Sequence, residues 1–326
     1  MPAMFIRLDP VAAVRLAGTL LLLGAGWSAA AVVAMARTLL APPRMSDGKA
    51  LWIFRRLSPA DLGLAFEDVS FVVRDDRSGK KLRLAGWWMP HPGAAGRCVV
   101  LLHGYADAKV GAIAWAPLWH SLGFNILAMD MRAHGQSDGV HCTAGDKERY
   151  DISQVLDQCK AERPEQTRQI ILFGVSLGAA IAGAVAALRE DMSAVVMDSP
   201  LADFRSAAMA QMDSAGAPGR WFQSAAVWLA ERWAGANLSA LRPVDLLGRI
   251  TCPVLLIAPK DDPFLSPAER LAMQQAMEAR NRPGQDLFWL VDAGHNAALQ
   301  AQPEEYARRL KLFVERALSA LASKER

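Results

Sequence analysis

Ser176 stands at the centre of the pentapeptide Gly174–Gly178, which reads Gly-Val-Ser-Leu-Gly. The apolar run 170–173 precedes it and an Ala-rich stretch follows, so the pattern predicts a strand, a tight turn and a helix. We expect glycine on both sides of the turn because a side chain there would collide with neighbouring backbone. Such a turn exposes the serine hydroxyl and places the backbone N–H of Leu177 at a helix N-terminus, where an oxyanion can be held. The pentapeptide alone also fits an ordinary strand-to-helix turn with a capping serine.

A serine hydroxyl becomes an effective nucleophile only when a base lies within hydrogen-bond reach. His295 follows the last predicted strand, 287–291, with Gly294 directly before it. This position at the end of a strand favours His295 as the base over an exposed loop residue.

The base in turn needs an acidic partner that fixes its orientation and stabilises its cation. Asp261 and Asp262 both follow the preceding strand, 254–258. We favour Asp262, which stands four residues past the predicted strand end and is fixed by the proline after it, while Asp261 caps the local turn. Asp198, directly after the strand 194–197, is a further candidate, although with Ser-Pro behind it the simpler role is to shape a turn.

The elements that must position these residues alternate between short apolar runs and longer helical patterns from Phe66 onward. Such alternation predicts a mainly parallel sheet covered by helices on both faces. The carboxyl ends of the parallel strands then lie along one edge, where ligands bind in such sheets. The expected strands are 69–73, 82–88, 99–102, 125–129, 170–173, 194–197, 254–258 and 287–291, and the expected helices are 110–121, 149–163, 267–281 and 303–322.

The segment from 201 to about 247 interrupts this alternation, because it contains no clear strand. It is rich in Met, Trp and Phe among small residues. Helices inserted after a strand would lie over the active edge as a lid and could line an acyl or aromatic pocket. The alternative is that these apolar residues only pack the insertion onto the main body.

The order Ser176, Asp262, His295 along the chain resembles that of the α/β-hydrolases. The similarity covers roughly 66–322. Further motifs that carry it are Leu101–Tyr105, Asp130–Gly139, Asp198–Pro200, Cys252–Ile257 and Gly294-His295. The resemblance implies an α/β-hydrolase fold with a mostly parallel central sheet and a short helical lid insertion.

The resemblance also implies roles for single residues. The backbone N–H of Tyr105 becomes the second oxyanion donor, facing that of Leu177. His103 and His134 match structural members of their motifs and not catalytic ones. The chain departs from the family pattern at Ala133, where glycine is usual, and at 258–259, where Ala-Pro replaces the common His-Gly before the acid.

These observations favour a serine hydrolase that cleaves a carboxylic ester, or alternatively a thioester, through a Ser-His-Asp triad and an acyl-enzyme. A peptidase or an acyltransferase on the same triad is the alternative, and a non-catalytic membrane scaffold is the alternative of another class. The resemblance implies no cofactor and no metal, and a small-molecule or lipid-like acyl substrate.

Composition narrows the possible partners. The chain has 326 residues and a net charge of +3 without a long basic stripe, which argues against nucleic-acid binding. Its four cysteines form no C-x-x-C pair, so we do not expect a structural zinc site and expect the cysteines to be free thiols. The oligomeric state is not indicated.

The segment 16–36 is apolar and uncharged, and Arg15 and Arg37 bracket it. About twenty such residues span a bilayer as a helix, which predicts a single-pass anchor. A signal peptide cleaved near 29–31, with export of the protein, and a buried core helix are the alternatives. More basic residues follow the span than precede it, which favours a cytoplasmic catalytic domain. The expected division is a tail and anchor at 1–44, a connector at 45–65 and a catalytic domain at 66–326, with the lid at about 201–247.

Overall fold

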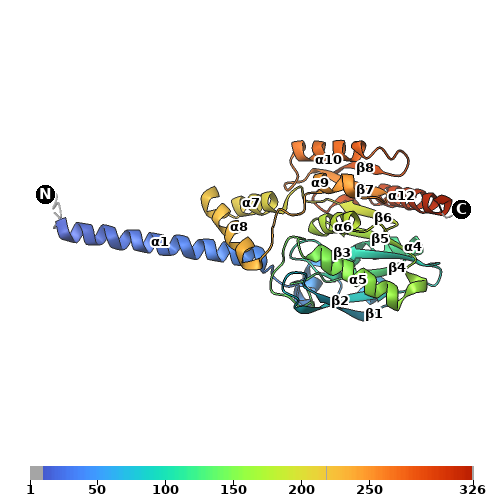
Figure 1. Cartoon of the computed structure of the whole chain (residues 1–326), viewed down its shortest axis with the longest axis horizontal. Helices are drawn as coiled ribbons and strands as arrows, with labels where there is room; N and C mark the ends of the chain where they lie inside the picture. Colours follow the sequence, from blue (N-terminus) through green and yellow to red (C-terminus); the bar gives the residue numbers. More distant parts are fainter. Residues whose placement is uncertain (1–9, 218, 325–326) are drawn as a thin grey trace.

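An eight-stranded sheet forms the centre of the computed structural model, which describes residues 10–217 and 219–324. The strand order is β1-β2-β4-β3-β5-β6-β7-β8 (Figure 1). β1 pairs with β2 and β2 with β4 in antiparallel fashion, and every other pair in the sheet is parallel. The mainly parallel sheet predicted from the alternation is therefore confirmed. The strands are β1 (Glu67–Arg74), β2 (Lys81–Met89), β3 (Arg97–Leu102), β4 (Asn125–Met129), β5 (Gln169–Val175), β6 (Ala194–Asp198), β7 (Val254–Asp261) and β8 (Leu287–Gly294).

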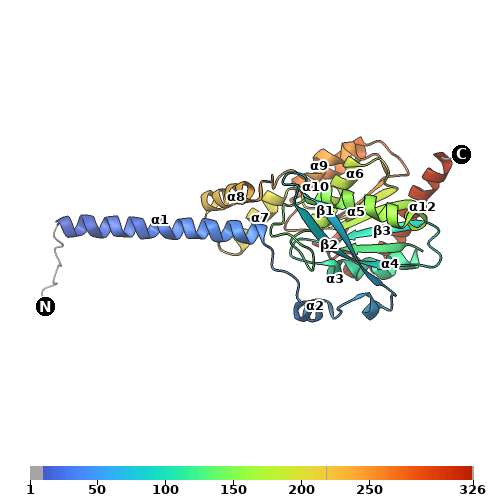
Figure 2. The ribbon, with the colours of Figure 1, turned by 60° about the horizontal axis from the view of Figure 1, so that its bottom comes forward.

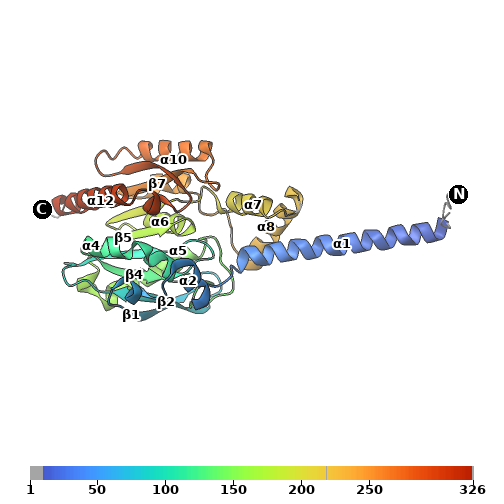
Figure 3. The ribbon, with the colours of Figure 1, turned by 180° about the vertical axis from the view of Figure 1, so that it is seen from behind.

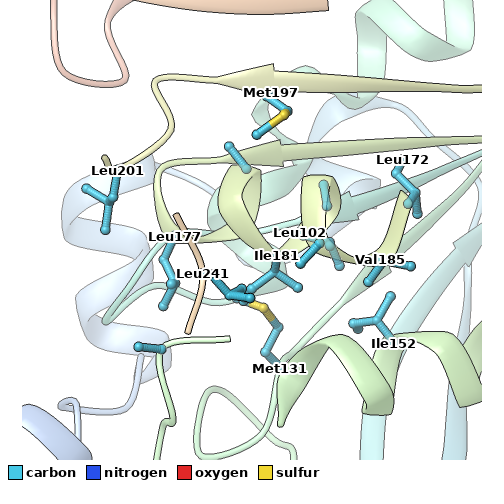
Figure 4. Packing of buried hydrophobic residues seen from close by; sticks show 14 of the residues in the cluster. Leu102, Met131, Ile152, Leu172, Leu177, Ile181, Val185, Met197, Leu201 and Leu241 are labelled. Atoms are coloured by element: carbon cyan, nitrogen blue, oxygen red, sulfur yellow. The ribbon is translucent and has the colours of Figure 1, made fainter. Parts of the chain in front are cut away.

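Helices cover both faces of this sheet, and each strand except the edge strand β1 supplies residues to both hydrophobic clusters. In β3, Val100 and Leu102 face one hydrophobic cluster while Val99 and Leu101 face the other, as the pleat of a strand requires. Figure 4 shows part of the first cluster, which includes Leu172 of β5 together with Ile181 and Val185. The first face is covered by α5 (Glu148–Glu162), α6 (Leu177–Leu188), α9 (Pro243–Leu246) and α10 (Pro267–Ala279), and the second by α3 (Lys109–Ala112), α4 (Ala116–Ser121), α11 (Ala298–Ala301) and α12 (Pro303–Lys324), as Figure 3 shows from behind.

The N-terminal helix α1 (Pro10–Leu40) extends away from the sheet domain (Figures 1 and 2). Its 31 residues make a helix about 46 Å long, which exceeds the hydrocarbon thickness of a bilayer. The window Leu23–Leu40 is long and apolar enough to cross a membrane, with mean hydropathy 1.4. The expected tail before Pro10 lies outside the described residues. The connector predicted at 45–65 contains a short helix, α2 (Asp47–Phe54), whose first turn is capped by the Ser46 side chain.

The helical insertion after β6 contains α7 (Phe204–Ser214), α8 (Arg220–Ala234) and the short α9, and we call the first two helices the α7–α8 hairpin. It lies beside the C-terminal part of α1 and projects from the domain in the same direction, and Figures 1, 2 and 3 agree on this placement.

Several expected elements differ from the structure, among them β8, which continues to Gly294 instead of ending at 291. The helix expected at 110–121 is broken into α3, a 3₁₀ turn and α4, because Pro117 lacks the N–H that a continuous helix needs. β7 continues to Asp261 instead of ending at 258, because a register shift after Pro259 lets Asp261 pair with Gly294 of β8. Asp262 therefore follows the strand directly and does not stand four residues beyond it.

Candidate active site

Ser176 occupies a strained turn between β5 and α6. Its φ of 55° and ψ of −120° lie outside the regions that residues with a side chain favour. A Cβ at Gly174 would lie 2.1 Å from the carbonyl oxygen of Gly178, and a Cβ at Gly178 would lie 2.3 Å from that of Leu102. The expected need for glycine on both sides of the serine is confirmed, because backbone atoms occupy the space of both side chains.

A chain of hydrogen bonds joins the three residues favoured from the sequence. The Ser176 Oγ lies 2.8 Å from Nε2 of His295, and Nδ1 of that ring lies 2.7 Å from Oδ2 of Asp262. The Asp262 side chain has no exposed surface, and its Oδ1 accepts a hydrogen bond from the Phe264 N–H at 2.8 Å. Asp261 is exposed to solvent, and within the described ranges its side chain forms no hydrogen bond or ion pair with His295. Of the two neighbouring carboxylates, the structure brings only Asp262 to the ring.

Two backbone amides expected to bind an oxyanion belong to segments that pass next to Ser176. Leu177 is the first residue of α6, so its N–H is at the positive end of the helix dipole. Tyr105 follows Gly104, where a Cβ would lie 3.4 Å from the Ser176 Cβ, so this loop passes close to the nucleophile. Within residues 10–217 and 219–324, neither the Leu177 nor the Tyr105 N–H donates a hydrogen bond to a protein acceptor.

The loop that carries Tyr105 is held from two sides. His134 Nε2 accepts a hydrogen bond from the Ala106 N–H at 3.3 Å. The Tyr105 hydroxyl donates to the carbonyl oxygens of Thr38, at 2.7 Å, and Leu39, at 3.1 Å. The last turn of α1 therefore contributes directly to the position of this loop, which sequence reasoning did not anticipate.

His103 is a buried, uncharged ring. Its Nδ1–H donates to the carbonyl of Gly104 at 2.7 Å, and its Nε2 accepts from the Met131 N–H at 3.0 Å. Burial lowers the pKa of His103 to about 3, and burial also lowers the pKa of His134. Both rings contact backbone and not the serine, as the sequence reasoning expected.

Asp198 lies at the end of β6 but does not contact the histidine. Its carboxylate accepts hydrogen bonds from the hydroxyls of Tyr306, at 2.7 Å, and Ser199, at 2.8 Å. Ser199 Oγ in turn accepts from the N–H of Asn296, next to His295, at 3.2 Å. Burial raises the pKa of Asp198 to about 6. Sequence reasoning missed Tyr306, because it lies in α12 and no local motif connects it to the strand end.

Aromatic side chains surround the catalytic candidates. The Phe264 ring packs edge-on against His295 with 4.9 Å between ring centroids, and the Phe204 ring lies 5.5 Å from that of Tyr105. Ser176 itself is only 6% exposed. The serine is thus almost fully covered, and Phe204, which contacts the Tyr105 loop, lies at the start of α7 at the base of the α7–α8 hairpin.

Ionisable side chains elsewhere do not form a recognisable metal site. No group of three or more His, Cys, Asp or Glu that could hold a metal ion occurs within the described ranges. The four cysteines are buried free thiols, as expected.

Comparisons with known proteins agree with the fold. Residues 99–309 match the model of the alpha/beta hydrolase family. Two curated relatives are the uncharacterized protein YqkD of Bacillus subtilis (strain 168), 26% identical over 178 residues, and the polyketide transferase ATR5 of Stachybotrys chlorohalonatus (strain IBT 40285), 31% identical over 144 residues. The matches cover 53% and 42% of this chain and span about half the length of those relatives, 58% and 46%.

Solved structures give a wider match. The esterase Pf2001 of Pyrococcus furiosus is 26% identical with a TM-score of 0.68, and the alignment covers 85% of this chain and 98% of the esterase. The alpha/beta hydrolase GrgF from Penicillium sp. sh18, 18% identical with a TM-score of 0.62 over 78% of this chain and 100% of its own, shares the fold.

Proposed function

Because the chain belongs to the alpha/beta hydrolase family and is a hydrolase, we propose that it cleaves a carboxylic ester through Ser176, His295 and Asp262. The observation that carries this proposal is the unbroken chain of two short hydrogen bonds from the serine hydroxyl to a fully buried carboxylate. The similarity to an esterase over most of the chain supports an ester as the substrate.

The geometry supports a mechanism in two halves. Nε2 of His295 takes the proton of Ser176 as Oγ attacks the ester carbonyl, and the Asp262 carboxylate stabilises the imidazolium that forms. The N–H groups of Leu177 and Tyr105 hold the oxyanion, and the loss of one such donor typically costs about 2.7–4 kcal/mol in the transition state. The imidazolium protonates the leaving alcohol. Water then repeats the sequence on the acyl-enzyme and releases the acid.

An acyl-enzyme can also pass its acyl group to an alcohol or amine in place of water. The relative named a polyketide transferase makes this a specific second candidate for the present chain. Product analysis after the protein is incubated with an activated ester and an acceptor alcohol distinguishes a hydrolase from a transferase. Free acid as the main product supports the hydrolase, and a new ester that forms faster than the acid supports the transferase.

A fluorophosphonate probe tests the nucleophile, because it reacts with an activated serine and not with an ordinary one. We expect the full chain to be labelled and the Ser176→Ala variant not to be. Absence of labelling in the intact protein would favour the non-catalytic scaffold. A series of p-nitrophenyl esters of increasing chain length then defines the acyl preference.

We also propose that α1 is an uncleaved membrane anchor through residues 16–36, with the connector at 45–65 and the catalytic domain at 66–326. The burial of Ala36, Leu39 and Leu40 against the domain supports retention of the helix. The basic residues after the span favour a cytoplasmic catalytic domain. Washing membranes with carbonate should leave the full-length protein in the pellet, and its release to the supernatant would contradict a spanning helix.

A further inference from the structure

The α7–α8 hairpin packs against the same part of the chain that is apolar enough to span a membrane. On α8, Ala226, Val227 and Ala230 are fully buried in one cluster with Ala36 and Leu40 of α1. The α1 side of this contact lies inside the window Leu23–Leu40. If α1 crosses a bilayer, α8 therefore lies at the membrane surface from which the C-terminal end of α1 emerges.

The opposite face of α8 exposes large apolar side chains. Trp221 and Trp228 are 72% and 64% exposed, and their spacing of seven residues places them two turns apart on one face. Arg220 and Arg232 are exposed near the two ends of the helix. Tryptophan and arginine are the residues that anchor proteins at the boundary between lipid and water. An exposed tryptophan stripe continuous with a membrane-spanning helix therefore fits lipid better than water.

Polar groups at the tip of the hairpin limit its depth. Asp213 at the end of α7 lies 3.9 Å from the guanidinium of Arg220 and accepts a hydrogen bond from Gln223 at 2.5 Å. Charged side chains are costly in the hydrocarbon region but stable among lipid headgroups. This tip therefore fits the headgroup level, where tryptophan rings are also stable.

We propose that the outward face of α8 is a bilayer-docking surface whose partner is membrane lipid. The base of the hairpin reaches the catalytic centre, since Phe204 packs on Tyr105 and the Tyr105 hydroxyl binds the last turn of α1. Docking therefore places the Ser176 site close to the interface. We therefore expect the substrate to be an acyl ester of an amphiphilic molecule that lies at the membrane interface. This inference rests on the proposed ester hydrolysis and the proposed anchor.

An environment-sensitive fluorophore on a cysteine at position 228 tests the docking without any catalytic readout. The four native cysteines are buried, so a Trp228→Cys variant of the full chain can be labelled selectively, and Leu271→Cys, at a 54% exposed position on α10, is the matched control. In phosphatidylcholine–phosphatidylglycerol vesicles we expect blue-shifted emission at 228, quenched by lipids with a nitroxide near the headgroup end of the acyl chain. We expect neither effect at 271. Water-like emission without lipid quenching at both positions would overturn the proposal.

A kinetic comparison tests the substrate class. The double variant Trp221→Ser/Trp228→Ser should lower turnover of a fluorogenic long-chain ester held in vesicles about tenfold more than turnover of a short soluble ester. Leu271→Ser should leave the ratio of the two activities unchanged. An unchanged ratio in the double variant would refute a role of the stripe in substrate access. If the intact chain hydrolyses neither ester, the proposed function fails, while the fluorophore result still decides the docking.

Discussion

Replacing Asp262 by Asn removes a negative charge from the catalytic centre and leaves nearly the same volume. The imidazolium of His295 forms next to this carboxylate, with 2.7 Å between nitrogen and oxygen and with no exposed surface on the acid. Two unit charges about 4 Å apart attract by about 4 kcal/mol at an effective dielectric constant of about 20. Since each 1.36 kcal/mol changes a rate about tenfold, this charge alone accounts for a factor of about 10³.

The hydrogen bond to Nδ1 adds a second contribution. The carboxylate keeps the proton on Nδ1 and leaves Nε2 free to accept from Ser176, whereas an amide can turn its own N–H toward the ring. The corresponding Asp-to-Asn change in a well-studied Ser-His-Asp protease lowers kcat about 10⁴-fold. We therefore expect Asp262→Asn to lower kcat by about 10³ to 10⁴.

The assay is the hydrolysis of a short p-nitrophenyl ester by the full chain in a mild detergent, at saturating substrate. Asp261→Asn is the matched control: it makes the same chemical change one residue away at an exposed site, and its kcat should stay near that of the wild type. Circular dichroism melts show whether each variant is folded. A folded Asp262→Asn enzyme within tenfold of the wild type, or an equal loss in Asp261→Asn, would refute the reasoning.

Three further changes test the scaffold around the triad. The stability of Asp198→Asn relative to the wild type should increase as pH rises from about 4 to 6 and stay constant above that. The reason is that Asp198 has a raised pKa of about 6 in the folded protein, so in this pH range the wild-type carboxyl ionises in the unfolded state first, and the wild type loses stability. Melting temperatures of both proteins across this pH range measure the difference. Arg132→Ala should lower the free energy of unfolding by about 3–5 kcal/mol in urea titrations, since two buried carboxylates lose their partner, whereas Arg308→Ala on the exposed face of α12 should have no measurable effect. Gly178→Ala should cost about 3 kcal/mol by the same titration and abolish probe labelling, because its Cβ meets a backbone oxygen that cannot move freely. Equal melting curves for the wild type and the glycine variant would contradict this.

Local sequence patterns predicted the parts of the site that are themselves local. The two glycines beside Ser176 reflect a collision within one turn, so they can be recognised from five residues. His295 and Asp262 each follow a parallel strand, and the sheet brings such positions to one edge regardless of the intervening sequence.

The parts that the sequence did not predict depend on contacts between distant segments. The extension of β7 to Asp261 depends on a register shift against β8, which apolar periodicity cannot reveal. Tyr306 reaches Asp198 from 108 residues away, and the Tyr105 hydroxyl reaches Thr38 across 67. Side chains of this kind have no neighbouring motif, because their partners are chosen by packing and not by spacing.

The contact between α1 and the Tyr105 loop has a consequence for how freely the N-terminal helix can be exchanged. A helix that served only as a tether could be replaced by any apolar span of similar length. Here the carbonyls of Thr38 and Leu39 are the acceptors of the Tyr105 hydroxyl, and the carbonyl of Leu40 accepts from the Cys142 N–H at 2.7 Å. Removing the last turns of α1 would leave these polar groups without partners, and replacing their side chains would disturb the packing against the small side chains of α8. The interchangeable part of the helix therefore ends before Val32, and from there onward it belongs to the architecture of the enzyme.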